Sequence, residues 1–122
     1  MRKQPKWHRN IEEDDFDASL SYLSLIYSPA ESARLVAALR RAKPARFKAK
    51  DIFRASQLSR LGVSNLRVVG YRKKIRAGKL LSPILLVRDK RHGKVVVADG
   101  YHRLCAVYEV NEDTWIPCRI VA

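Results

Sequence analysis

The sequence predicts an α+β fold, a small mixed β-sheet flanked by helices, with an N-terminal pair of helices. Two continuously apolar segments, 84–87 and 95–98, are separated by a polar loop, which predicts a hairpin of strands covered on both faces. Apolar residues at helical spacing precede and follow this hairpin. With 122 residues, 47% of them hydrophobic, the chain is long enough to bury one core.

An N-terminal tail is predicted for residues 1–14, basic at first and acidic from Glu12 on, with Trp7 docking it. Residues 15–46 follow as a helical extension. Its first helix, at about 15–27, carries acids in the first turn, where the helix dipole favours them. The apolar positions of that helix share one face: Phe16, Leu20, Leu23 and Ile26 or Tyr27.

The second helix is predicted to begin at Pro29 and to run to about Ala42. Ser28 suits the N-cap, and Glu31 at the third helical position completes a capping box. Pro44 then stops the helix. We expect the two helices to pack against the sheet; docking of a partner, or a homodimer formed through them, is the alternative.

Residues 47–122 form the third part of the chain. Its first segment, 47–53, alternates, which predicts a weak strand or an extended entry to a short helix near Ser56. The inward positions there are Phe47, Ala49 and Ile52. Ser64 can cap the next helix, which ends at Gly78. The apolar positions of this helix are Leu66, Val69 and Ile75.

A basic surface covers the other positions of that helix, and we expect it to contact nucleic acid. The residues are Arg67, Arg72, Lys73, Lys74 and Arg76. The net charge of +13 attracts polyanions: nucleic acid, nucleotide phosphates or an acidic partner protein. The alternative is a solvated surface that serves only solubility.

The hairpin and the segments after it give the clearest pattern. Pro83 opens the first strand, and Asp99–Gly100 ends the second. A helical period resumes over Tyr101–Tyr108, and a last strand follows at 116–121.

The turn from the second strand into this helix is the candidate site. A strand that turns through glycine into a helix directs free backbone N–H groups and the positive end of the helix dipole at one spot, where anions bind. Gly100 and Tyr101 bring the backbone close to a phosphate. His102 can donate a hydrogen bond, and Arg103 can hold the phosphate in a bidentate manner.

Asp99 is unusual beside these groups, because a carboxylate repels phosphate unless a divalent metal or a proton donor lies between them. It therefore suits an Mg²⁺ ligand or a general base, with His102 as a second acid–base group. The plain alternative is that Asp–Gly is a common turn, that His102 caps or packs, and that Arg103 pairs with Asp99 or Glu109.

The order of these segments resembles the ParB/sulfiredoxin superfamily over roughly Phe47 to Val121. The features in common are a helix that ends in Gly78, a strand opened by Pro83, a short hairpin, a G-x-H-R turn and Ala106 three residues after Arg103. The resemblance implies a ParB/sulfiredoxin-like domain at 47–122 that binds nucleotide phosphates at the turn.

The turn departs from that of sulfiredoxins, in which G-C-H-R supplies a nucleophilic Cys while the His and Arg contact ATP phosphates. Tyr101 stands at the nucleophile position, so sulfinic-acid reductase activity is not expected. Cys105 lies about one helical turn further on, where a small apolar side chain would face inward.

Two other branches match in part. ParB partition proteins bind CTP with a G-E-R-R-x-x-A turn; Gly100, Arg103 and Ala106 match it, His102 replaces the first Arg, and no helix-turn-helix domain is expected after residue 121. Free-serine kinases have a D-G-H-T-R turn whose Asp takes part in phosphoryl transfer. Asp99 and Gly100 match that turn, and the next two residues match it approximately.

We therefore expect binding of a nucleotide or of nucleic-acid phosphate at residues 99–103, with a basic surface facing DNA or RNA. The alternatives are an NTP-dependent phosphotransferase or NTPase that uses Asp99, with Mg²⁺ and a nucleoside triphosphate as cofactors, or an accessory module that binds an acidic protein. A nuclease is less favoured, because Asp51, Asp89 and Glu109 have no diagnostic spacing relative to Asp99.

Cys105 and Cys118 are predicted to be buried free thiols, and a zinc site drawing on His8, His92 or His102 is not expected. The sequence shows no secretory signal and no apolar run that could cross a bilayer. We expect no membrane partner and a cytoplasmic location.

Overall fold

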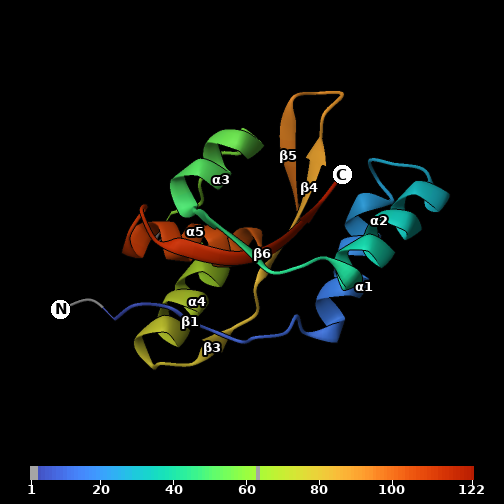
Figure 1. Cartoon of the computed structure of the whole chain (residues 1–122). Helices are drawn as coiled ribbons and strands as arrows, with labels where there is room; N and C mark the ends of the chain where they lie inside the picture. Colours follow the sequence, from blue (N-terminus) through green and yellow to red (C-terminus); the bar gives the residue numbers. More distant parts are fainter. Residues whose placement is uncertain (1–2, 63) are drawn as a thin grey trace.

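A four-stranded mixed sheet organises the chain in the computed structural model, which describes residues 3–62 and 64–122 (Figure 1). The spatial order of the strands is β2 (Ala45–Lys48), β6 (Trp115–Val121), β4 (Ile84–Asp89) and β5 (Lys94–Asp99). β4 runs parallel to β6, whereas β2 and β5 are antiparallel to their neighbours. The predicted α+β class and the hairpin are confirmed.

One face of the sheet is covered by the two N-terminal helices, α1 (Glu13–Leu23) and α2 (Pro29–Arg41). Figure 1 shows them together on one side of the β4–β5 hairpin. Their buried side chains form one cluster with β4 and β5: Phe16, Leu23, Leu35, Val36, Leu39, Leu85, Val87, Val96 and Ala98. The expectation that these helices pack against the sheet is confirmed.

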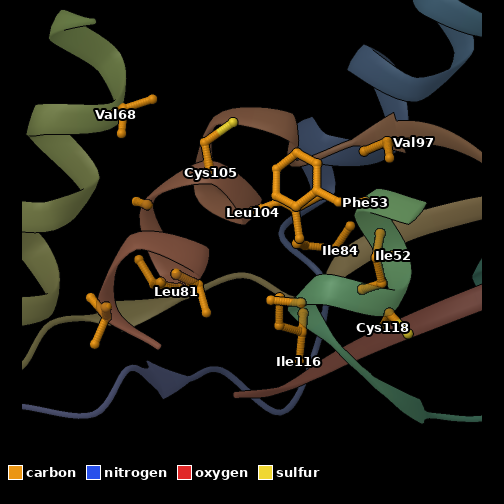
Figure 2. Packing of buried hydrophobic residues seen from close by; sticks show 14 of the residues in the cluster. Ile52, Phe53, Val68, Leu81, Ile84, Val97, Leu104, Cys105, Ile116 and Cys118 are labelled. Carbon is orange, nitrogen blue, oxygen red and sulfur yellow. The ribbon is translucent and has the colours of Figure 1, made fainter. Parts of the chain in front are cut away.

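The other face carries α3 (Ala49–Ser56), α4 (Leu66–Arg76) and α5 (Tyr101–Val110). Figure 2 shows side chains of these three helices meeting those of the strands in the larger core cluster. Cys105 and Cys118 belong to this cluster and are free thiols, as predicted. Burial raises the pKa of the Cys118 thiol to about 12, which makes it inert at neutral pH.

A second, two-stranded parallel sheet joins β1 (Lys6–Trp7) to β3 (Leu80–Leu81). Trp7 packs against the larger core cluster, and the backbone N–H of His8 donates to the carbonyl of Leu81 at 2.8 Å. The predicted docking of the tail by Trp7 is therefore confirmed. The pairing also sets the chain that leads into α1 beside the chain that leads into β4.

The inward face of α1 differs from the predicted one. Phe16, Ser19 and Leu23 are buried, while Leu20 and Ile26 are 38% and 45% exposed. The helix ends at Leu23, and the hydroxyl of Ser24 donates to the carbonyl of Leu20. Positions 16, 19 and 23 follow the helical period, and the small Ser19 allows close approach to the sheet.

The segment predicted as one alternating run divides at residue 48. The strand ends at Lys48, and the residues from Ala49 on are helical. The backbone N–H groups of Ala49 and Lys50 donate to the carbonyls of Thr114 and Glu112, both at 3.0 Å. These tertiary hydrogen bonds satisfy the first turn of α3, so the helix starts without a capping side chain.

The capping residues were predicted correctly for α2 but not for α4. The hydroxyl of Ser28 accepts from the N–H of Glu31 at 3.1 Å, but the Glu31 carboxylate pairs with Arg34 and does not close a capping box. In α4 the cap is Asn65, not Ser64: its side-chain oxygen accepts from two backbone N–H groups, those of Arg67 and Val68. The buried positions of α4 are Val68 and Ile75, whereas Leu66 is 85% exposed.

None of the helices in residues 3–62 and 64–122 combines the length and the apolar character needed to span a membrane.

Candidate functional site

The candidate turn lies where β5 passes through Gly100 into α5. Gly100 has φ +104°, a left-handed conformation that favours glycine. The first intrahelical hydrogen bond runs from the N–H of Leu104 to the carbonyl of Gly100 at 2.9 Å. The N–H groups of residues 101–103 precede that bond, and Gly100 has no side chain to cap them. The positive end of α5 is therefore open to an acceptor from outside the helix.

A cleft of about 520 Å³ lies at this turn, which we call the α5 cleft. Its walls come from α1, α4, the end of β5 and the first turn of α5. The lining residues are Asp14, Asp15, Ala18, Tyr22, Leu58, Arg67, Tyr71, Val97, Ala98, Asp99, Gly100, Tyr101, His102 and Arg103. All four residues predicted to bind phosphate, and Asp99 beside them, thus line one cavity.

Arg103 is buried among carboxylates, with 6% of its surface exposed. Its Nη2 lies 3.0 Å from Asp99 Oδ2, 3.4 Å from Asp15 Oδ2 and 3.3 Å from the carbonyl oxygen of Pro83. Its Nε is buried and has no hydrogen-bond partner among the described residues. Burial disfavours the guanidinium charge, but Asp99 and then Asp15 raise the pKa of Arg103 overall, so the side chain stays charged.

Asp99 has the most perturbed acidity of the residues in the cleft. Burial raises the pKa of Asp99 from 3.8 to about 6; Arg103 lowers it in part, and the like charge of Asp15 raises it again. A carboxyl group with this pKa exchanges its proton close to neutral pH. That property suits a general base.

His102 and Tyr101 form the rim of the cleft. Burial, followed by the positive charge of Arg67, lowers the pKa of His102, so the imidazole is neutral at pH 7. The Tyr101 hydroxyl donates to the carbonyl of Ser59, and its ring meets the His102 ring edge-on at 5.4 Å between centroids. Tyr101 thus holds the segment before α4 against the first turn of α5.

The predicted basic surface of α4 divides into two parts. Arg67 is exposed and lines the α5 cleft. Arg72 is half-buried and pairs with Glu109 at 2.6 Å. The remaining three, Lys73, Lys74 and Arg76, are exposed and lie outside the cleft lining. The structure therefore brings only Arg67 of this set to the predicted phosphate site.

Sequence reasoning missed the contribution of α1 to the site. Asp14, Asp15 and Tyr22 come from that helix, and Tyr71 comes from the buried side of α4. The acidic cluster before Phe16 is evident in the sequence, but it was interpreted as a favourable first turn of a helix and not as part of a site. The signal that could have been used is position: Asp15 directly precedes a residue that packs on the sheet, so it lies at the border of the buried face.

The acids considered for a nuclease are not brought to Asp99. Asp51 lies on α3, Asp89 pairs with His92 at 2.9 Å, and Glu109 pairs with Arg72; none lines the α5 cleft. Within residues 3–62 and 64–122, no group of three or more His, Cys, Asp or Glu side chains is placed to hold a metal ion. Asp14, Asp15 and Asp99 share the cleft but do not form such a group.

Comparisons of the chain with protein-family models, with curated proteins and with solved structures found no match.

Proposed function

We propose that this chain is a ParB/sulfiredoxin-like domain that binds a nucleotide through its phosphates in the α5 cleft. The observation that carries the proposal is the uncapped first turn of α5, whose residues line a cavity of nucleotide size. The proposal is supported by the order of the segments on which the resemblance rests: α4 ends before Gly78, Pro83 precedes β4, and the hairpin leads into the G-x-H-R turn.

Side chains around the cleft supply the other contacts that a nucleotide needs. Arg67 offers a cation to the phosphates, and the neutral His102 offers a hydrogen bond. Tyr22 and Tyr71 offer aromatic surface for a base. A phosphate that took the place of Asp15 would also give the guanidinium of Arg103, with its unpaired Nε, a bidentate partner.

The nucleic-acid part of the proposal rests on the charge of +13 and on the exposed part of α4. Lys73, Lys74 and Arg76 would extend a backbone contact from Arg67, whereas Arg72 is held by Glu109. A homodimer through α1 and α2, an acidic protein partner and a cytoplasmic location stay predictions.

The test is a calorimetric and thermal-shift series with inorganic phosphate and with nucleoside mono-, di- and triphosphates, each with and without Mg²⁺. A nucleotide at a hundred times its Kd raises the free energy of unfolding by about 2.7 kcal/mol. Arg67→Ala is expected to weaken binding about tenfold, because it removes a charge-assisted contact. Arg91→Ala removes an equal charge from the exposed β4–β5 loop and should leave the Kd unchanged.

Two results would contradict the proposal. One is that no member of the series binds. The other is that Arg67→Ala and Arg91→Ala weaken binding to the same extent, since the effect would then come from net charge and not from the cleft.

The acidity of Asp99 favours a second function, phosphoryl transfer or NTP hydrolysis. Asp99 would accept the proton of a hydroxyl group or a water molecule while the oxygen of that nucleophile attacks the γ-phosphorus. The bond between the γ-phosphorus and the oxygen that bridges it to the β-phosphate then breaks, and the nucleoside diphosphate leaves. His102 would then supply a hydrogen bond to the transferred group. If Asp99→Asn binds nucleotide but turns it over as fast as the wild type, this second function is wrong.

A further inference from the structure

The face of the sheet formed by β2 and β6 carries charged and aromatic side chains together. In the β2–β6 register, Phe47 lies opposite Ile116, and both contribute to the larger core cluster. Side chains alternate along a strand, so the neighbouring positions face the other way. Those positions are the pairs Arg46 with Pro117 and Lys48 with Trp115. We call these four residues the cation–tryptophan face.

Trp115 is the centre of this face and is 48% exposed. The guanidinium carbon of Arg46 lies 4.8 Å from the centroid of the indole ring, and the Nζ of Lys48 lies 5.3 Å from it. A groove of about 460 Å³ runs beside the ring, lined by Pro44, Ala45, Arg46, Trp115 and Pro117. It shares no lining residue with the α5 cleft within the described part of the chain.

The surroundings of the face are strongly cationic. Residues 40–50 contain six basic residues and no acid. Arg119 of β6 donates to the carbonyl of Arg40 at 2.9 Å, which joins the face to the basic end of α2. Asp113 offsets part of this charge, with its Oδ1 2.6 Å from Lys50 Nζ and 3.9 Å from Lys48 Nζ. Arg46 has no carboxylate within ion-pair distance among residues 3–62 and 64–122.

We propose that the cation–tryptophan face binds single-stranded nucleic acid, with one base stacked on Trp115 and backbone phosphates at Arg46 and Lys48. A half-exposed indole beside two cations supplies both contacts that single strands use, a flat ring for a base and positive charge for the backbone. Base pairs of a duplex are stacked on one another and cannot offer a free ring face, so a single strand fits better than a duplex. An acidic peptide would use the cations but would leave the indole without a stacking partner.

The experiment measures binding of fluorescently labelled 12-nucleotide single strands, one arm DNA and one arm RNA, by anisotropy at low and physiological salt. Trp115→Ala is expected to weaken binding at least about fivefold, and Trp115→Phe to keep most of it, because a smaller ring still stacks. A plot of log K against log salt concentration has a negative slope, and Arg46→Ala should make that slope less steep by about one unit. Trp115 is half exposed, so neither Trp115→Ala nor Trp115→Phe should unfold the chain. Circular dichroism checks this.

Arg91→Ala is the matched control, since it removes one exposed charge from the β4–β5 loop, which contributes no residue to the groove. Stacking on this ring is measured by quenching of tryptophan fluorescence. The single-stranded nucleic acid should quench the fluorescence of the wild type more than that of Trp115→Phe, in which Trp7 is the remaining tryptophan. Arg67→Ala in the α5 cleft should leave this quenching in place, so that the face and the cleft are tested separately.

Three results would overturn the proposal. They are wild-type affinity in both Trp115→Ala and Arg46→Ala, equal losses in Arg46→Ala and Arg91→Ala, and duplex binding that is as tight as single-strand binding and as sensitive to Trp115→Ala. Binding of poly-glutamate that competes with the strands and does not depend on Trp115 would assign the face to an acidic protein instead.

Discussion

Asp15 in α1 and Arg103 in α5 are 88 positions apart in the sequence, yet their carboxylate and guanidinium groups lie 3.4 Å apart with little exposure to solvent. The contact ties the N-terminal helices to the candidate turn. Together with Asp99 it surrounds one buried cation with two carboxylates. The charges of Asp15, Asp99 and Arg103 therefore contribute both to the α5 cleft and to the packing of α1 against the rest of the fold.

Removing Asp15 should destabilise the fold. Asp15→Ala leaves the buried guanidinium with Asp99 as its one remaining carboxylate in the described structure, at an expected cost of about 1–3 kcal/mol in the free energy of unfolding. Asp17→Ala, an exposed acid on the same helix, should change it by less than about 0.5 kcal/mol. Urea denaturation followed by circular dichroism measures both. Equal effects would mean that the pair adds nothing to stability.

The raised pKa of Asp99 predicts a specific dependence of stability on pH. The folded protein holds this proton up to a pH of about 6, whereas the unfolded chain releases it near 3.8. Between these two values the folded state binds more protons, so the contribution of Asp99 to stability falls as the pH rises. Asp89 and Asp113, whose pKa values are lowered, act in the opposite direction at lower pH.

Asp99→Asn removes this titrating carboxyl group and so serves as the reference for the wild type. The stability of the wild type relative to the variant should decline from about pH 4 to about pH 6 and level off above that range. Chemical denaturation at half-unit steps of pH measures the difference. A difference that stays constant over this range would contradict the raised pKa.

Gly100 should tolerate no side chain. A Cβ there would lie 2.9 Å from both Ile84 Cγ1 and Arg103 Nη2, in addition to the left-handed φ of +104°. We expect Gly100→Ala to cost about 2–4 kcal/mol, the sum of backbone strain and overpacking. Gly93→Ala shares a positive φ but has open space, so it should cost about 1–2 kcal/mol. Similar losses in both variants would show that crowding at Gly100 is unimportant.

The packing of α1 on the sheet can be tested with two leucines that are two residues apart. Leu23 is fully buried in the cluster with β4 and β5, so Leu23→Ala should lower the free energy of unfolding by about 2–5 kcal/mol. Leu25 is 85% exposed, and Leu25→Ala should change it by less than about 0.5 kcal/mol. Thermal unfolding distinguishes the two. A small effect of Leu23→Ala would mean that α1 is not part of the cooperative core.

The sequence was sufficient for the hairpin and the turn because their signals are local. Pro83, the apolar run after it and Gly100 each restrict the backbone within a few residues. The same holds for the start of α2, where Ser28 caps the helix. The four predicted phosphate-binding residues therefore fell on one cavity wall.

Elements whose form depends on distant partners were predicted less well. The first turn of α3 is helical because its N–H groups reach carbonyls of residues 112 and 114. The inward face of α4 is set by packing on the larger core cluster, which buries Val68 and Ile75 and leaves Leu66 exposed. No local pattern could connect Asp15 with Arg103, because only the packing of α1 on β5 brings them together.

The position of β6 in the sheet has a consequence for how the protein is made. β6 comes after β1–β5 in the sequence, yet it lies between β2 and β4 in the sheet and hydrogen-bonds to both. Until residues 115–121 have left the ribosome, β2 and β4 expose unpaired edges to other chains. The four-stranded sheet is therefore completed only after synthesis of this last strand, and nascent chains that stall before Trp115 should be the species most prone to aggregation.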